Sequence, residues 1–356
     1  MYHAQKIITK PSLGQKVKRA LPVLANLLPL SLLQRCSRQK VFLPFYHLIN
    51  NEAPKHVQSL YAVRDEALFE ADLDYLLRYF EPIALSELIA INQGRKAKPQ
   101  KAVMHLSFDD GLQECSEIIA PILVRKGIPA TFFINSAFLD NKALMFRYKQ
   151  SLCLQAIKVQ SPTFFNSYFF PELEFLGVRT EMRPESLVNR AQYGDDELLD
   201  HIGKVLSIDF EAFLQETKPY MSSEQVSVLL QQGFSIGGHS IDHPLYNKIA
   251  LAEQLRQTIE SQQFLESKFD LDYRVFAFPF TDDGLTKSFF SALQAQFPFD
   301  LSFGGAGLKQ DVIPNNLQRF PMESDRLNSA RKLINTEFLY YLLKIPFGKN
   351  RLKRAD

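Results

Sequence analysis

Short apolar runs alternate with amphipathic helical segments along most of this chain, and this alternation limits the possible folds more than any other feature. Helices are predicted over residues 66–80, 115–127, 251–268 and 287–297. Strands are predicted in VFLPFYHLI from Val41, KAVMHLSF from Lys101, PATFFIN from Pro129, FSIGG from Phe234, RVFAFPF from Arg274 and FDLSFG from Phe299. Such alternation favours an α/β architecture with parallel strands, in which the loops at the carboxyl ends of the strands carry the chemistry.

The composition is that of an ordinary globular chain. Its 356 residues are 46% hydrophobic and 22% charged, which is enough for one large domain or two smaller ones. The formal charge of +2 gives no overall attraction to nucleic acid, although both ends are locally basic. Cys36, Cys115 and Cys153 are too few and too scattered for a disulfide framework, which favours a reducing, cytoplasmic compartment.

The segment from Ala20 to Leu33 is the candidate for targeting. ALPVLANLLPLSLL is too short to cross a bilayer and contains two prolines. QRCSRQK follows it rather than a small-residue cleavage site, so no signal peptide is predicted. Because basic residues precede its leucine-rich face, a peripheral membrane contact stays open beside the alternative of a solvated terminus.

The alternation is interrupted between residues 140 and 220. The stretch SPTFFNSYFFPELEFLG from Ser161 is aromatic and irregular, whereas DDELLDHIGKVLSIDFEAFLQE from Asp195 is typical of helix. We therefore predict an N-terminal basic and apolar segment at residues 1–40 and a main domain at 41–325, with a largely helical insertion at 140–220. A helical tail is predicted at 326–356.

Polar residues follow two of the predicted strands. Asp109 and Asp110 end the strand in HLSFDDG, and His239 and His243 follow another strand in GGHSIDHP. On a helical turn, side chains four residues apart project to the same side. Each motif also has a structural explanation, a tight turn with a capping Asp and a surface turn, respectively. Together, two imidazoles and one carboxylate form a set that binds a divalent metal and leaves positions open for water and substrate.

The carboxylates of Asp109 and Asp110 would then have different roles. If one binds the metal, its neighbour faces another way along the backbone and can take a proton from a water molecule. A metal lowers the pKa of that water toward neutrality, so a carboxylate can act as the base at physiological pH.

The motifs LSFDDG, GGHSIDHP and FAFPF, in this order, resemble those of the metal-dependent polysaccharide deacetylases, carbohydrate esterase family four. FYHLIN resembles the opening of the subgroup whose chains begin with a Tyr-His motif. The resemblance covers residues 41–323 apart from the block at 140–220. It implies a carbohydrate substrate.

The resemblance also implies roles for individual residues. Asp109 would be the general base, and Asp110, His239 and His243 would hold the metal, usually zinc or another divalent transition ion. Phe278, Pro279 and Phe280 would line the substrate groove, with the Phe280 backbone N–H helping to stabilise the oxyanion. Alternating aromatics also pack well in a core strand, which remains the other explanation for Phe278.

Hydrolysis of an amide requires an acid for the departing amine, and no histidine follows His243. We favour His47, which the Tyr-His subgroup places on the first strand; a core histidine is the alternative. Arg319, in LQRFPME, resembles a late Arg-hydrophobic-Pro element and would orient Asp109 through a bidentate pair.

The prediction is a distorted (β/α) barrel of about seven strands that hydrolyses N-acetyl groups on amino sugars of a polysaccharide or saccharide precursor. Three features depart from the family pattern: the glycine after the third motif is displaced to Gly284, tryptophan is absent, and the insertion is long enough to cap the site. The alternatives are a deacylase of another small amide or ester, and a non-catalytic saccharide-binding protein. No oligomeric state is predicted.

Overall fold

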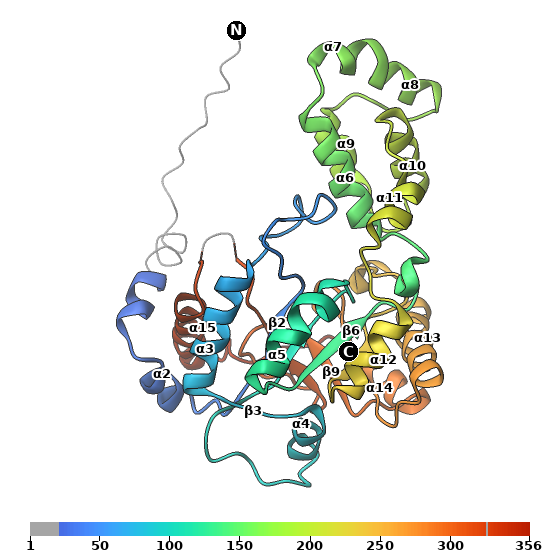
Figure 1. The fold of residues 1–356 in the computed structure, drawn as a ribbon. Coiled ribbons are helices and arrows are strands. Elements are labelled where there is room, and N and C mark those ends of the chain that lie inside the picture. Colours follow the sequence, from blue (N-terminus) through green and yellow to red (C-terminus); the bar gives the residue numbers. More distant parts are fainter. Residues whose placement is uncertain (1–20, 325–326) are drawn as a thin grey trace.

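The computed structural model describes residues 21–324 and 327–356, and a parallel sheet lies at its centre (Figure 1). Every neighbouring pair in this sheet is parallel, in the order β10-β9-β8-β7-β6-β5-β2-β11. The strands are β2 (Pro44–Tyr46), β5 (Leu106–Phe108), β6 (Ala130–Ile134), β7 (Ser235–Gly238), β8 (Val275–Ala277), β9 (Leu301–Gly304), β10 (Asn316–Gln318) and β11 (Phe320–Pro321).

One bent stretch of chain closes the sheet. Only Arg319 separates β10, which pairs with β9, from β11, which pairs with β2 at the opposite end of the sheet. The Arg319 backbone N–H donates to the Gly304 carbonyl, and the next N–H, that of Phe320, donates to the Leu43 carbonyl. Since β10 and β11 act as one strand, the closed sheet has seven strand positions. The predicted distorted (β/α) barrel is confirmed.

Two of the predicted strands are each divided into two shorter strands, one in this sheet and one in a second, smaller sheet. Residues 41–46 form β1 (Val41–Phe42) and then β2, and residues 103–108 form β4 (Val103–Met104) and then β5. β1 and β4 pair with β3 (Glu81–Pro82) in a small parallel sheet of three strands. At the break between β4 and β5, the buried His105 ring bonds to the Ile83 carbonyl and the Thr131 hydroxyl, which ties the two sheets together.

Helices cover the outside of the barrel, as amphipathic segments do in this architecture. Local capping sets their ends: Asp65 caps α3, and Ser222 with Gln225 forms a capping box at α12. These helices are α3 (Glu66–Tyr79), α4 (Leu85–Asn92), the π-helix Cys115–Ile119 running into α5 (Ala120–Lys126), α12 (Ser223–Gln231), α13 (Leu251–Phe269) and α14 (Lys287–Gln296). Three-residue 3₁₀ turns lie at Leu139–Asn141, Tyr246–Lys248 and Ile345–Phe347.

The segment predicted as an insertion forms a helical lobe that stands away from the barrel (Figure 1). Its apolar side chains form one hydrophobic cluster together with Leu48, Val57 and Leu112 from outside the lobe. The Asn141 side chain joins the two ends of the lobe by donating to the Tyr220 carbonyl and accepting from the Tyr220 backbone N–H. The stretch predicted as irregular is helical, since backbone hydrogen bonds run on through its aromatic residues. The lobe contains α6 (Phe146–Lys158), α7 (Pro162–Phe164), a π-helix (Phe165–Phe169), α8 (Phe170–Phe175), α9 (Pro184–Arg190), α10 (Asp196–Val205) and α11 (Phe210–Thr217).

One helix from the first part of the described chain packs against one from its last part. α2 (Leu30–Ser37) contacts α15 (Ala330–Lys344), and both lie on the side of the barrel that carries α3 (Figure 1). The basic residues predicted to lead into this segment, Lys16, Lys18 and Arg19, lie outside the described residues. Within the described ranges, no helix combines the length and apolar character needed to span a bilayer.

Candidate metal and catalytic site

A pocket of about 320 Å³ opens at the carboxyl ends of the barrel strands. Asp109 and Asp110 follow β5, His243 follows β7, His47 follows β2, and Arg319 lies between β10 and β11. All five line this one pocket although they are far apart in the sequence. This is the end of a parallel barrel at which loops with catalytic side chains collect.

Asp110, His239 and His243 form a compact group of potential metal ligands. One ligand atom from each lies within 4.8 Å of the others, and all three residues are buried. Asp110 Oδ1 is 3.2 Å from His243 Nε2 and 3.5 Å from His239 Nε2. Two imidazole nitrogens and one carboxylate oxygen suit zinc and other divalent transition metals, with coordination positions left for water or substrate.

The loop carrying the two histidines is a bend rather than the helical turn predicted from their spacing. Ser240 and His243 both have positive φ, +71° and +64°, which a helical turn does not allow. The Ser240 hydroxyl accepts from the His243 backbone N–H at 2.9 Å, and the Asn135 side chain donates to the His239 carbonyl. Hydrogen bonds within the loop and from Asn135 after β6, and not helical periodicity, therefore bring the two imidazoles together.

Neighbouring groups orient this cluster as a metal would require. His239 Nδ1 donates to the Ala277 carbonyl at 2.7 Å, which leaves the Nε2 lone pair directed at the cluster. Burial lowers the pKa of His243 in spite of Asp110, which favours the neutral ring that metals bind. Asp110 Oδ1 is buried and accepts no hydrogen bond from any described residue. A divalent cation would satisfy this oxygen, so the residues fit the metal.

Asp109 is held by Arg319. The guanidinium donates to both carboxylate oxygens, at 2.7 and 2.8 Å, and to the Ser107 hydroxyl at 3.0 Å. It also lies over the Phe45 ring, 4.3 Å from the centroid. Burial would raise the pKa of Asp109, but Arg319 and His239 outweigh burial and hold it below the usual value. Asp109 is therefore an ionised carboxylate with a fixed orientation.

His47 is paired with Glu323, a residue that the sequence analysis did not assign to the site. Its Nδ1 lies 2.5 Å from Glu323 Oε2, while Glu323 Oε1 accepts from the backbone N–H of His47 at 2.6 Å. Burial alone would lower the pKa of His47, but Glu323, Asp110 and Asp109 raise it to about 10. The Glu323 carboxylate thus favours the protonated form of the ring, which lies at the wall of the pocket.

The three residues of the third motif have different surroundings. Phe280 is 48% exposed, lines the pocket, and has its ring centroid 4.5 Å from that of His243. Its φ is +57°, and its backbone N–H has no acceptor among the described residues. Phe278 touches the pocket but packs chiefly in a phenylalanine cluster with Phe276 and Phe289. Pro279 is buried and lies outside the pocket lining.

Comparison with known proteins agrees with this arrangement. A family model described as polysaccharide deacetylase matches residues 96–162 and 196–295, on either side of part of the helical lobe. The chain belongs to the polysaccharide deacetylase family. The matched residues of this deacetylase family member include the Asp pair and both histidines, whereas His47, Arg319 and Glu323 lie outside them.

Two solved structures share the fold of this family member. One is the Streptococcus pyogenes deacetylase PplD in complex with acetate, with 13% identity and a TM-score of 0.53, covering 84% of this chain and 98% of that one. The other is IcaB from Ammonifex degensii, with 16% identity and a TM-score of 0.52, covering 83% and 97%. No curated protein gives a significant match.

The sequence analysis missed several residues of the pocket. Glu323 carries no local signal, because a single Glu after the Pro321 strand end is common on surfaces. Tyr61 packs against His47, with ring centroids 4.9 Å apart and ring planes tilted by 31°, and it comes from a loop with no recognisable motif. Met145 and Arg147 reach the pocket from the start of the helical lobe. The lobe of this family member therefore contributes directly to the pocket wall.

Proposed function

We propose that this chain is a metal-dependent deacetylase that removes N-acetyl groups from amino sugars of a polysaccharide or saccharide precursor. The convergence of an Asp-His-His cluster, an ionised carboxylate and a protonated imidazole on one pocket supports this most directly. Family membership supports a carbohydrate substrate.

Asp110, His239 and His243 would hold the cation, and their nitrogen and oxygen donors fit zinc. A divalent cation there would lower the pKa of a water molecule and polarise the amide carbonyl.

The residues around the cluster have separate roles in this proposal. Asp109 takes the proton of the attacking water, because it is ionised and Arg319 fixes both of its oxygens. His47 gives a proton to the departing amine, because Glu323 keeps its ring charged. Phe280 lines the same pocket, and its free backbone N–H would donate to the oxygen that becomes negative during attack.

The size and lining of the pocket suit a sugar. A volume of about 320 Å³ is near the lower end of ligand pockets, which favours one sugar unit at a time. The rings of Tyr61 and Phe280 contribute apolar surface beside the polar cluster.

Acetate release from a panel of N-acetylated saccharides, with and without a chelator, tests the proposal. We expect release that stops when the metal is removed and returns when zinc is added. Asp109→Asn should lower turnover by roughly 100- to 10,000-fold while the metal content stays unchanged, whereas Asp110→Asn should lose both. Acetate release by metal-free protein would contradict the metal role, and full activity of Asp109→Asn would contradict its role as base.

A further inference from the structure

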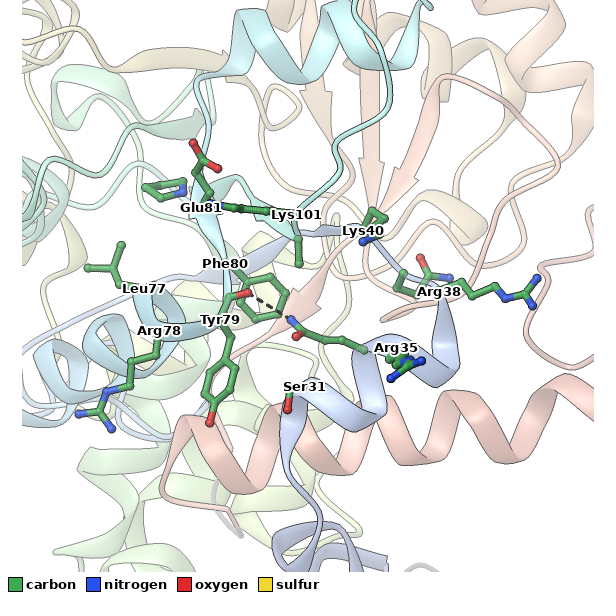
Figure 2. A pocket seen from close by; sticks show the side chains of 14 residues that line it. Ser31, Arg35, Arg38, Lys40, Leu77, Arg78, Tyr79, Phe80, Glu81 and Lys101 are labelled. Atoms are coloured by element: carbon green, nitrogen blue, oxygen red, sulfur yellow. Dashed lines mark hydrogen bonds between the residues drawn. The ribbon is translucent and has the colours of Figure 1, made fainter.

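A second cavity, of about 810 Å³, lies between α2 and the end of α3 (Figure 2). It shares no lining residue with the reaction pocket. Five cations line it and Glu81 is its one carboxylate; the cations are Arg35, Arg38, Lys40, Arg78 and Lys101. None of the five forms an ion pair within the described parts of the chain.

The fold brings these charges together from three segments. Arg35 and Arg38 belong to α2 and its left-handed cap, Arg78 lies at the end of α3, and Lys101 precedes β4. Figure 2 shows Arg35 and Arg38 on one side of the cavity and Arg78 on the other. Gln34 joins the two helices by donating to the Tyr79 carbonyl at 3.4 Å. Like charges held this close repel one another, so the surface attracts anions.

Exposed apolar side chains lie on α2 and on the helical residues just before it; residues 21–37 are called the strip below. Val23 is 67% exposed, Leu24 56%, Leu27 75% and Leu32 46%. The inner side of this strip packs on α15: Asn335 donates to the Ala25 and Leu28 carbonyls, and Gln39 donates to the Tyr341 hydroxyl. With that side covered, the four apolar side chains face outward, an arrangement that marks an interaction surface.

We propose that α2 and the helical residues before it dock onto an anionic membrane surface. The four exposed apolar side chains enter the acyl boundary, and the five cations bind the phosphate groups of anionic lipids. α2 is about 12 Å long, so its exposed leucine and its arginines lie within one short helix beside the membrane.

The arrangement fits a lipid surface better than one dissolved anion. Arg35, Arg38 and Lys101 are exposed on long, unanchored side chains, and no buried polar group points into the cavity to hold a single ion. In addition, a dissolved anion would gain nothing from the apolar side chains beside it. In the sequence, Lys16, Lys18 and Arg19 add further positive charge directly before the strip.

Flotation of the full chain with lipid vesicles tests this proposal. We expect binding to vesicles of phosphatidylcholine with about one third phosphatidylglycerol, weaker binding as salt rises, and little binding to phosphatidylcholine alone. The triple variant Arg35→Glu, Arg38→Glu, Lys101→Glu should bind the anionic vesicles about 100-fold more weakly. Leu24→Ser with Leu27→Ser should also weaken binding, since these side chains would no longer enter the lipid.

A matched variant controls for total charge. Arg179→Glu, Lys204→Glu, Lys248→Glu makes the same charge change at exposed cations that form no ion pair within the described chain, and it should bind like the unmodified protein. Equal loss in both triple variants would contradict a specific surface. Unchanged binding of the serine variant would also contradict the proposal. So would a chain that binds inorganic phosphate but does not bind anionic vesicles. Acetate release is measured in parallel and should stay constant, because this surface lies outside the reaction pocket.

Discussion

The contact with Glu323 supports His47 as the general acid more strongly than the position of His47 at the end of its strand does. A histidine at its ordinary pKa would be mostly neutral above pH 7 and could not supply a proton. Glu323 contacts both the Nδ1 atom and the backbone N–H of His47, so it fixes the ring and favours its charged form. The acid thus depends on a residue 276 positions away in the chain.

Replacing Glu323 with Gln should move the alkaline limit of activity. The protonated ring is the active form, and its pKa of about 10 keeps it charged through neutral pH. Without the carboxylate, the pKa falls toward its ordinary value of about 6.5, so activity is lost as the pH rises above about 7. The pH profile of acetate release measures this shift. Glu266→Gln, far from the pocket, should leave the profile unchanged, and an unshifted profile in Glu323→Gln would exclude His47 as the acid.

At the scale of elements, β7 has to pass close to the aromatic side chains that fill the barrel. Gly237 lies on this strand two residues before His239. A Cβ at Gly237 would lie 2.6 Å from Phe133 Cε1 and 2.8 Å from Val275 Cγ2. The Phe133 ring in turn lies 5.1 Å from the Arg319 guanidinium. The absence of a side chain at Gly237 therefore supports both the strand and the packing around Arg319.

Gly237→Ala should lower the free energy of unfolding by about 1–3 kcal/mol, because the added methyl group overpacks the barrel. Urea unfolding measures the change. Gly305→Ala is the matched control, since its Cβ would meet only the Phe280 carbonyl oxygen, at an ordinary 3.7 Å. Equal stability of the two variants would show that Phe133 moves aside freely and that the close approach is not a constraint.

Across the whole molecule, Arg354 connects the end of the chain to the loop that follows Phe280. Its guanidinium donates to Asp311 at 2.9 Å, to the Asp282 and Leu285 carbonyls, and to the Asp282 carboxylate. Asn316 of β10 donates to the same Asp282 carboxylate at 2.8 Å. The closing strand and the third motif are thus fixed by one buried network.

Arg354→Met should destabilise the protein by about 3–5 kcal/mol, because it leaves Asp282 and Asp311 as uncompensated buried carboxylates. The midpoint of urea unfolding measures this loss. Arg351→Met, at an exposed arginine in no ion pair of the described chain, should change stability by less than about 0.5 kcal/mol. A loss in Arg354→Met no larger than in Arg351→Met would show that the network does not stabilise the fold.

Much of the barrel was predictable because alternating strands and helices leave a periodic signal in short windows. The helices over α3, α13 and α14 were predicted close to their observed ends, since caps and apolar spacing are local. The aromatic stretch at residues 161–177 was predicted wrongly, because its phenylalanines lack a polar face until the other helices of the lobe pack on them. The closure of the barrel at Arg319 has no local signal at all.

The sequence by itself determined the alternating fold, the Asp pair and the two histidines, because spacing and residue chemistry are properties of short segments. Tertiary structure alone decided that Glu323 charges His47, that one bent strand closes the barrel at Arg319, and that cations from three segments line one cavity. These contacts join positions tens to hundreds of residues apart. Their energies depend on burial and distance, and both arise only when the chain closes on itself.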